Sequence, residues 1–174
     1  DKGGTALARQ YMEGRREVLE QLWAGLAELG FTGINVPEEY GGLGQGTISL
    51  VPIFEELGRV VAPGLYAETL ALAVPLLLAY GTEEQKNRYL SEIAAGKRMV
   101  TFAFIEPDGQ FAPEDVQMAA VKVGDGYRLK GRKTVVPYGD AAQTFLVLAR
   151  TAPGGGEHGL SLFLVDKENA AVSV

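Results

Sequence analysis

Residues 96–109 read GKRMVTFAFIEPDG, and the hydrophobic pattern of the chain changes within this stretch. Before it, apolar residues recur at spacings of three and four, which is typical of amphipathic helices. After it, short runs rich in β-branched and aromatic residues alternate with turn residues, which favours strands. A block of helices followed by a block of strands indicates an α+β protein rather than a wound α/β sheet. We therefore expect an all-helical domain over residues 1–98 and an antiparallel β-barrel or sandwich domain over residues 99–174.

The first half contains apolar stripes for about four main helices. These helices are predicted over residues 6–30, 47–61, 65–81 and 82–98. Gly30 is expected to end the first helix, Pro52 to lie in the first turn of the second, and Pro75 to kink the third. The fourth begins with the sequence TEEQ, which matches a capping box in which Thr82 and Gln85 satisfy free backbone amides.

Five short runs in the second half predict strands. They cover residues 99–105, 116–123, 127–136, 144–150 and 160–166. The sequence GDG at residues 124–126 lies between the second and third runs and predicts a tight hairpin. Several short strands at this spacing favour a sandwich or a barrel.

The composition excludes several classes of function. The chain has 22 acidic and 16 basic residues and a net charge of −6, so we expect no basic face for nucleic acid. It contains no cysteine, which rules out disulfides, thiolate zinc sites and cysteine nucleophiles. The most apolar run, residues 70–80, contains Pro75 and is too short to cross a membrane. No signal peptide is visible, and we expect a cytoplasmic protein.

Local motifs alone predict no catalytic constellation. The glycines at residues 154–156 lack the Lys-Ser/Thr of a phosphate-binding P-loop, so a hairpin loop is the simpler interpretation. His158 is the only histidine, and a metal site formed with Glu157 would need ligands from elsewhere, so no metal site is predicted. Glu38 and Glu39 are adjacent, whereas a catalytic carboxylate pair needs a defined separation, so a solvated turn is favoured.

Several stretches resemble the acyl-CoA dehydrogenase family of flavoenzymes. In chain order they are GFTGINVPEEYGGLG (residues 30–44), FEELGRVVAPG (54–64), YGTEEQKNRYLSEIAAGK (80–97), FAFIEPDG (102–109) and YRLKGRKTVVPYGDAAQTFLVLAR (127–150). The similarity covers nearly all of residues 15–174 in the right order. The resemblance implies an N-terminal helical domain, a middle β domain, and FAD-dependent α,β-desaturation of an acyl-CoA thioester.

The family also has a C-terminal four-helix domain, which usually supplies the catalytic carboxylate and much of the tetramer interface. The chain ends at Val174, before any stretch that resembles this domain, so the resemblance implies a fragment without a catalytic base. We expect no dehydrogenation by these 174 residues alone. The resemblance also implies an acyl-CoA substrate, an electron-transfer flavoprotein-type acceptor, and a homo- or hetero-oligomer of like subunits.

In the family, the strand before Glu-Pro passes close to the flavin. Matched by position, this strand gives Phe102, Phe104 and Ile105 as cofactor-binding residues. Ile105 replaces the family's threonine and has no side-chain hydrogen-bond donor. The backbone groups of Phe104 and Ile105 remain as possible contacts for FAD.

A second flavin-contacting segment of the family reads Lys-x-Trp-Ile-Thr-Asn-Gly, and here it reads KTVVPYG at residues 133–139. Val135 occupies the position of the family's tryptophan, which packs against the flavin. Pro137, which has no backbone N–H, occupies the position of the family's hydroxyl-bearing residue. Phe111 occupies a serine position on the coenzyme A side and is the predicted substrate-binding residue. These changes together predict altered or absent FAD binding.

The resemblance leaves two main hypotheses about function. In the first, these residues are part of an active FAD-dependent acyl-CoA dehydrogenase with an unusual flavin pocket. In the second, the chain is a non-catalytic, FAD-poor member of the same fold that acts as a structural or acyl-CoA-binding partner in a hetero-oligomer. Other flavin chemistry on this fold, such as that of an oxidase or a hydroxylase, is a third.

Overall fold

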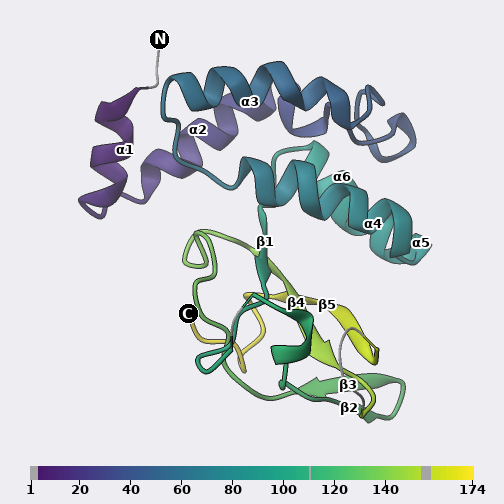
Figure 1. The fold of residues 1–174 in the computed structure, drawn as a ribbon. Coiled ribbons are helices and arrows are strands. Elements are labelled where there is room, and N and C mark those ends of the chain that lie inside the picture. Colours follow the sequence, from purple (N-terminus) through teal and green to yellow (C-terminus); the bar gives the residue numbers. More distant parts are fainter. Residues whose placement is uncertain (1–3, 110, 154–157) are drawn as a thin grey trace. The chain divides into compact units, whose positions relative to one another are not determined.

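The computed structural model describes residues 4–109, 111–153 and 158–174. The chain divides into two units, Asp1–Val100 and Thr101–Val174 (Figure 1). The first unit is built from helices, and strands supply most of the regular structure of the second. The expected α+β fold class is therefore confirmed. That the chain forms separate domains over residues 1–98 and 99–174 stays a prediction.

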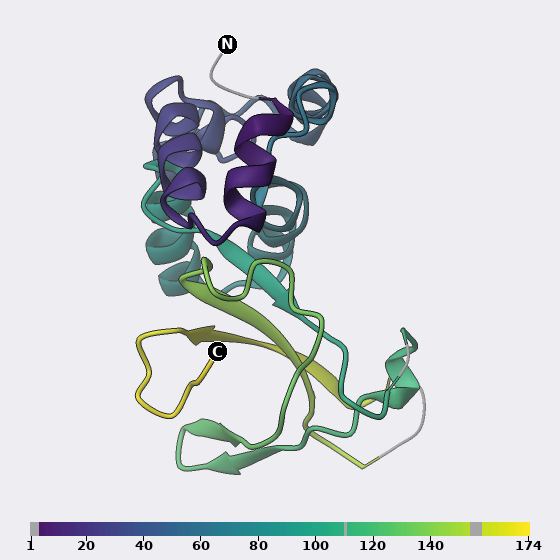
Figure 2. The same cartoon turned by 90° about the vertical axis from the view of Figure 1, so that its left-hand side faces the viewer.

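The first apolar stripe forms two helices rather than one, α1 (Thr5–Met12) and α2 (Glu17–Glu28) (Figure 2). Between them Gly14 has φ = 94°, a left-handed conformation through which a helix cannot continue. The prediction of one helix over residues 6–30 is wrong, because the apolar spacing runs on across this backbone break. Gly30, with φ = 78°, follows the end of α2 as predicted. The buried residues of α2 are Val18, Leu19 and Trp23.

The next two predicted helices are present. α3 covers Leu50–Arg59 and has Pro52 in its first turn. The π-helical segment η4 (Ala67–Ala73) continues directly into α4 (Val74–Tyr80). Pro75 lies just after the wider π turns, where its missing N–H interrupts the regular hydrogen-bond pattern of the helix.

The fourth predicted helix begins at the capping box, as expected. The Thr82 hydroxyl accepts a hydrogen bond from the Gln85 N–H at 3.2 Å, and the Thr82 N–H donates to Gln85 Oε1 at 2.9 Å. The helix continues as α5 (Glu83–Gln85), the π-helical η5 (Lys86–Leu90) and α6 (Ser91–Ala94). Tyr89, Leu90 and Ile93 form its buried side.

Short 3-10 helices lie in the connecting loops. They are η1 (Phe31–Gly33), η2 (Glu38–Tyr40), η3 (Thr47–Ser49) and η6 (Pro113–Asp115). The first three belong to the glycine-rich connection between α2 and α3.

The second half forms two small sheets. Their strands are β1 (Val100–Ala103), β2 (Ala120–Val123), β3 (Gly126–Leu129), β4 (Thr144–Arg150) and β5 (Leu160–Asp166). β1, β4 and β5 form one sheet in the order β1-β4-β5, and β2 pairs with β3 in the other. The core of the larger sheet is β4, whose residues 144–147 are all buried. The described strands form two separate sheets, so closure into a barrel stays a prediction.

The predicted hairpin at residues 124–126 is confirmed, because β2 and β3 are antiparallel with Val123 opposite Gly126. The predicted strand over residues 127–136 is only partly correct, since β3 ends at Leu129. Val135 has φ = 50° and Tyr138 has φ = 46°. A strand cannot pass through this left-handed backbone, even though the β-branched residues before it favour one.

Candidate functional site

Residues 101–106 and 133–137 lie side by side in the structure. The Thr134 N–H donates to the Ile105 carbonyl at 2.7 Å, and the Thr101 hydroxyl donates to the Pro137 carbonyl at 2.7 Å. The two segments contain the residues that we predict to contact a flavin. They are separated by about thirty residues in the chain, and these hydrogen bonds bring them together.

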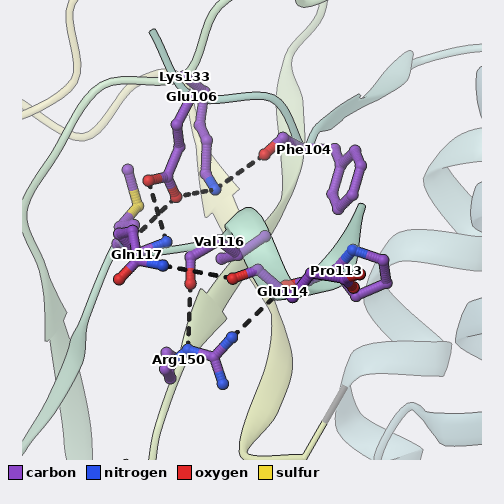
Figure 3. A network of polar contacts seen from close by, with 9 residues as sticks. Phe104, Glu106, Pro113, Glu114, Val116, Gln117, Lys133 and Arg150 are labelled. Atoms are coloured by element: carbon purple, nitrogen blue, oxygen red, sulfur yellow. Dashed lines mark hydrogen bonds and ion pairs between the residues drawn. The ribbon is translucent and has the colours of Figure 1, made fainter. Parts of the chain in front are cut away.

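A buried ion pair joins the same two segments (Figure 3). Lys133 Nζ lies 2.8 Å from Glu106 Oε1, and the two side chains are 6% and 13% exposed. The ammonium group also donates to the Phe104 carbonyl at 3.0 Å. Sequence reasoning missed this pair, because the two residues are 27 positions apart and the motifs that contain them do not show that they meet.

The Glu106 carboxylate also holds the chain just before β2. It accepts hydrogen bonds from the Met118 N–H at 2.9 Å and from the Gln117 N–H at 3.1 Å. One carboxylate thus links the end of the β1 segment, the entry to β2 and the segment that follows β3.

The pKa of Glu106 is lowered from its ordinary value of 4.5. Burial is the largest single influence and raises the pKa, but the hydrogen bonds from Lys133, Met118 and Gln117 and the charge of Lys133 together outweigh it. The carboxylate is therefore ionised at neutral pH, opposite an ammonium ion.

This lowered pKa predicts that stability depends on pH in the acid range. A carboxyl group with a lowered folded pKa stabilises the fold fully above its unfolded pKa, and this contribution is lost as pH falls through the folded value. We expect the free energy of unfolding to decrease below about pH 4.5, and to decrease less in Glu106→Gln. Denaturant unfolding at several pH values checks this, and equal pH dependence in the two proteins would contradict it.

Arg150 holds the other side of the loop that leads into β2 (Figure 3). Its guanidinium group donates to the carbonyls of Val116 at 3.0 Å, His158 at 2.9 Å and Pro113 at 3.4 Å. Its backbone N–H donates to the Met118 carbonyl at 2.8 Å. Glu106 therefore holds the chain at Gln117 and Met118, and Arg150 holds it at Pro113 and Val116.

The residues predicted to contact a cofactor or substrate have different surroundings. The rings of Phe102 and Phe104 stack with centroids 5.9 Å apart and are partly exposed, as is Ile105. Val135 is 78% exposed, and Pro137 is also exposed. Phe111, the predicted substrate residue, lies two residues before η6 and is 80% exposed.

The donor groups around these residues allow a test of whether FAD fits. The carbonyls of Phe104 and Ile105 already accept hydrogen bonds from Lys133 and Thr134. Within the described ranges, the backbone N–H groups of Ile105 and Val135 have no hydrogen-bond partner. An isoalloxazine ring needs apolar packing and a few donors for its carbonyl oxygens and ring nitrogens, and these residues offer both. Apolar side chains and these two backbone amides are the groups that would hold a flavin here, without a side-chain hydroxyl at positions 105 and 137.

The remaining candidates do not form a site. Glu38 and Glu39 are exposed on η2, as expected for a solvated turn. His158 is exposed, while Glu157 and the glycines at residues 154–156 lie outside the described residues. In the part of the chain that the structure describes, no three or more metal-ligating side chains come together. None of the helices there has the length and hydrophobicity to span a bilayer.

Comparison with known families gives two matches that together cover almost the whole chain. Residues 5–97 match the model for the acyl-CoA dehydrogenase N-terminal domain, and residues 101–174 match the model for the acyl-CoA dehydrogenase middle domain.

Individual relatives agree with these matches. The chain is 33% identical to an acyl-CoA dehydrogenase of Bacillus subtilis, over 97% of this chain and 45% of the relative. It is 35% identical to the CarC subunit of the caffeyl-CoA reductase-Etf complex of Acetobacterium woodii, over 91% of this chain and 41% of the relative. The chain thus spans less than half the length of these relatives.

Solved structures show the same fold. An acyl-CoA dehydrogenase from Geobacillus kaustophilus has a TM-score of 0.77 and 32% identity, over 86% of this chain and 40% of that one. The ChsE4-ChsE5 complex from Mycobacterium tuberculosis has a TM-score of 0.75 and 31% identity, over 88% of this chain and 39% of that one.

Proposed function

Because the chain belongs to the acyl-CoA dehydrogenase family, we propose that it forms part of an FAD-dependent oxidoreductase that introduces a double bond between Cα and Cβ of an acyl-CoA thioester. Membership of the family by itself supports only the general class of the enzyme, an oxidoreductase. The observation that carries the proposal further is the pairing of residues 101–106 with residues 133–137, the two segments that we predict to contact the flavin.

The proposed cofactor contacts are mainly apolar. Phe102, Phe104, Ile105 and Val135 would pack against the ring system, and the amides of Ile105 and Val135 would donate to it. Pro137 would supply only its ring and no donor. Bound FAD would supply the hydride acceptor, while these residues orient the cofactor and Phe111 contacts the coenzyme A side of the substrate.

We propose that the base which removes the α-proton lies outside these 174 residues. The proposed acceptor of electrons is an electron-transfer flavoprotein, since one relative is a subunit of an Etf complex. We also propose an oligomer of like subunits in the cytoplasm.

A second candidate function is a non-catalytic subunit that binds FAD weakly or not at all. It is favoured by Ile105 and Pro137, which cannot donate from their side chains, and by the carbonyls of Phe104 and Ile105, which are already hydrogen-bonded. One structural relative is a complex of two chains, ChsE4 and ChsE5. In such an assembly this chain would be the partner of a flavin-bearing subunit.

A visible absorption spectrum of the full-length protein tests the proposed function. We expect purified protein to show the bands of oxidised flavin in stoichiometric amount, and an acyl-CoA substrate to bleach them. A protein that stays colourless after incubation with FAD would overturn the proposal. If colour then appears only after coexpression with a dehydrogenase-like neighbour, the second candidate function is supported.

A further inference from the structure

Glu106 and Lys133 form a largely buried ionic group, and both side chains also make hydrogen bonds with other residues (Figure 3). The Glu106 carboxylate accepts from the ammonium group and from two consecutive backbone amides, those of Gln117 and Met118. The ammonium group in turn donates to the Phe104 carbonyl. In this structure the four hydrogen bonds join three chain segments.

Stability alone is a poor explanation for such a pair. Desolvation of two charges offsets most of their attraction, so apolar residues of similar size often stabilise a fold as well or better. A buried ionic group does, however, penalise every arrangement that leaves one of its members unpaired. Its clearest effect is therefore on which alignment of the segments is allowed.

The segments that the ion pair aligns are those proposed to contact the cofactor. Lys133 is bonded to the carbonyl of Phe104, and the next residue, Thr134, donates to the carbonyl of Ile105. Val135 follows immediately. A shift of either segment along the other would remove both of these hydrogen bonds.

We propose that Glu106 and Lys133 are positioning residues for the flavin. They hold the segment with Phe104 and Ile105 in register with the segment that carries Val135, so that the free amides and apolar side chains of both segments form one surface. This role rests on the proposed function. The carboxylate and the ammonium group are not interchangeable, because the amides of Gln117 and Met118 need an acceptor at position 106.

The test compares FAD affinity and backbone hydrogen exchange in variants of the full-length protein. We expect Glu106→Gln and Lys133→Met to weaken FAD binding at least tenfold and to alter the visible circular dichroism of bound flavin at saturation. Lys133→Arg keeps the positive charge but not the compact ammonium group, so it should weaken FAD binding less than Lys133→Met does. The exchanged pair, Glu106→Lys with Lys133→Glu, should not recover affinity, because it leaves the two amides without an acceptor. Glu56→Gln, which breaks an exposed ion pair with Arg59, is the matched control and should leave affinity unchanged.

Hydrogen exchange of the FAD-free proteins gives a second readout. In Glu106→Gln the amides of Gln117, Met118 and Thr134 should exchange faster, while those of α2 stay unchanged. The positioning role alone would be overturned if both Glu106→Gln and Lys133→Met kept the wild-type affinity and flavin spectrum. Recovery of affinity by the exchanged pair would also overturn it. A wild-type protein that does not bind FAD would overturn the proposed function and this role with it.

Discussion

Replacement of Gly42 by alanine is expected to lower the free energy of unfolding by about 3 kcal/mol. A Cβ atom at this position would lie 2.0 Å from the Val36 carbonyl oxygen and 2.6 Å from the Val36 Cβ. The obstacle is mainly backbone, which cannot rotate away as a flexible side chain does. The alanine is therefore accommodated only if the backbone at Gly42 moves away from the backbone at Val36.

Hydrogen bonds across the same loop make that movement costly. Gly42 N donates to the Pro37 carbonyl at 3.1 Å, and Gly44 N donates to the Val36 carbonyl at 2.8 Å. Both would be stretched by an added methyl group, which adds to the cost of overpacking. The loop belongs to residues 30–44, one of the stretches that resemble the family.

Two other glycines provide controls for denaturant unfolding. Gly58 lies in α3 with open space around its Cβ position, so Gly58→Ala should raise stability by up to about 1 kcal/mol. Gly41 also has open space but φ = 83°, so Gly41→Ala should cost about 1 to 2 kcal/mol from backbone strain alone. If Gly42→Ala costs no more than Gly41→Ala, the steric argument is wrong.

Features that depend on short-range pattern were predictable from the sequence. The capping box at Thr82 and the hairpin at residues 124–126 each depend on a few adjacent residues with one preferred geometry. The end of α2 at Gly30 is of the same kind. The break at Gly14 was not predicted, because an isolated glycine within a periodic stripe is also compatible with a continuous helix.

Matching by position selects the two segments of the candidate site, but it does not show the contacts between them. Matching by position identified the segments at residues 102–105 and 133–139, and these segments are neighbours in the structure. The Glu106–Lys133 pair was not predictable, because it depends on the chain path between two residues that are 27 positions apart. The left-handed backbone at Val135 was missed because a β-branched residue favours the opposite conformation.

Replacement of Thr69 by valine is expected to lower the free energy of unfolding by about 2 to 4 kcal/mol. The Thr69 side chain is fully buried, and its hydroxyl both donates to the Val100 carbonyl and accepts from the Val100 N–H, each at 2.9 Å. Valine has nearly the same shape, so the packing stays while two buried backbone groups lose their partner.

Thr69→Ser distinguishes the contribution of the hydroxyl to stability from that of the methyl group. Serine keeps both hydrogen bonds and removes one buried methyl, which should cost only about 1 kcal/mol. Denaturant unfolding of the two variants checks the order, and a valine variant as stable as the serine variant would contradict it. Thr69 lies within the π-helical segment η4, and Val100 is the first residue of β1. One hydroxyl of a helical segment therefore satisfies both backbone groups of Val100 within the first unit.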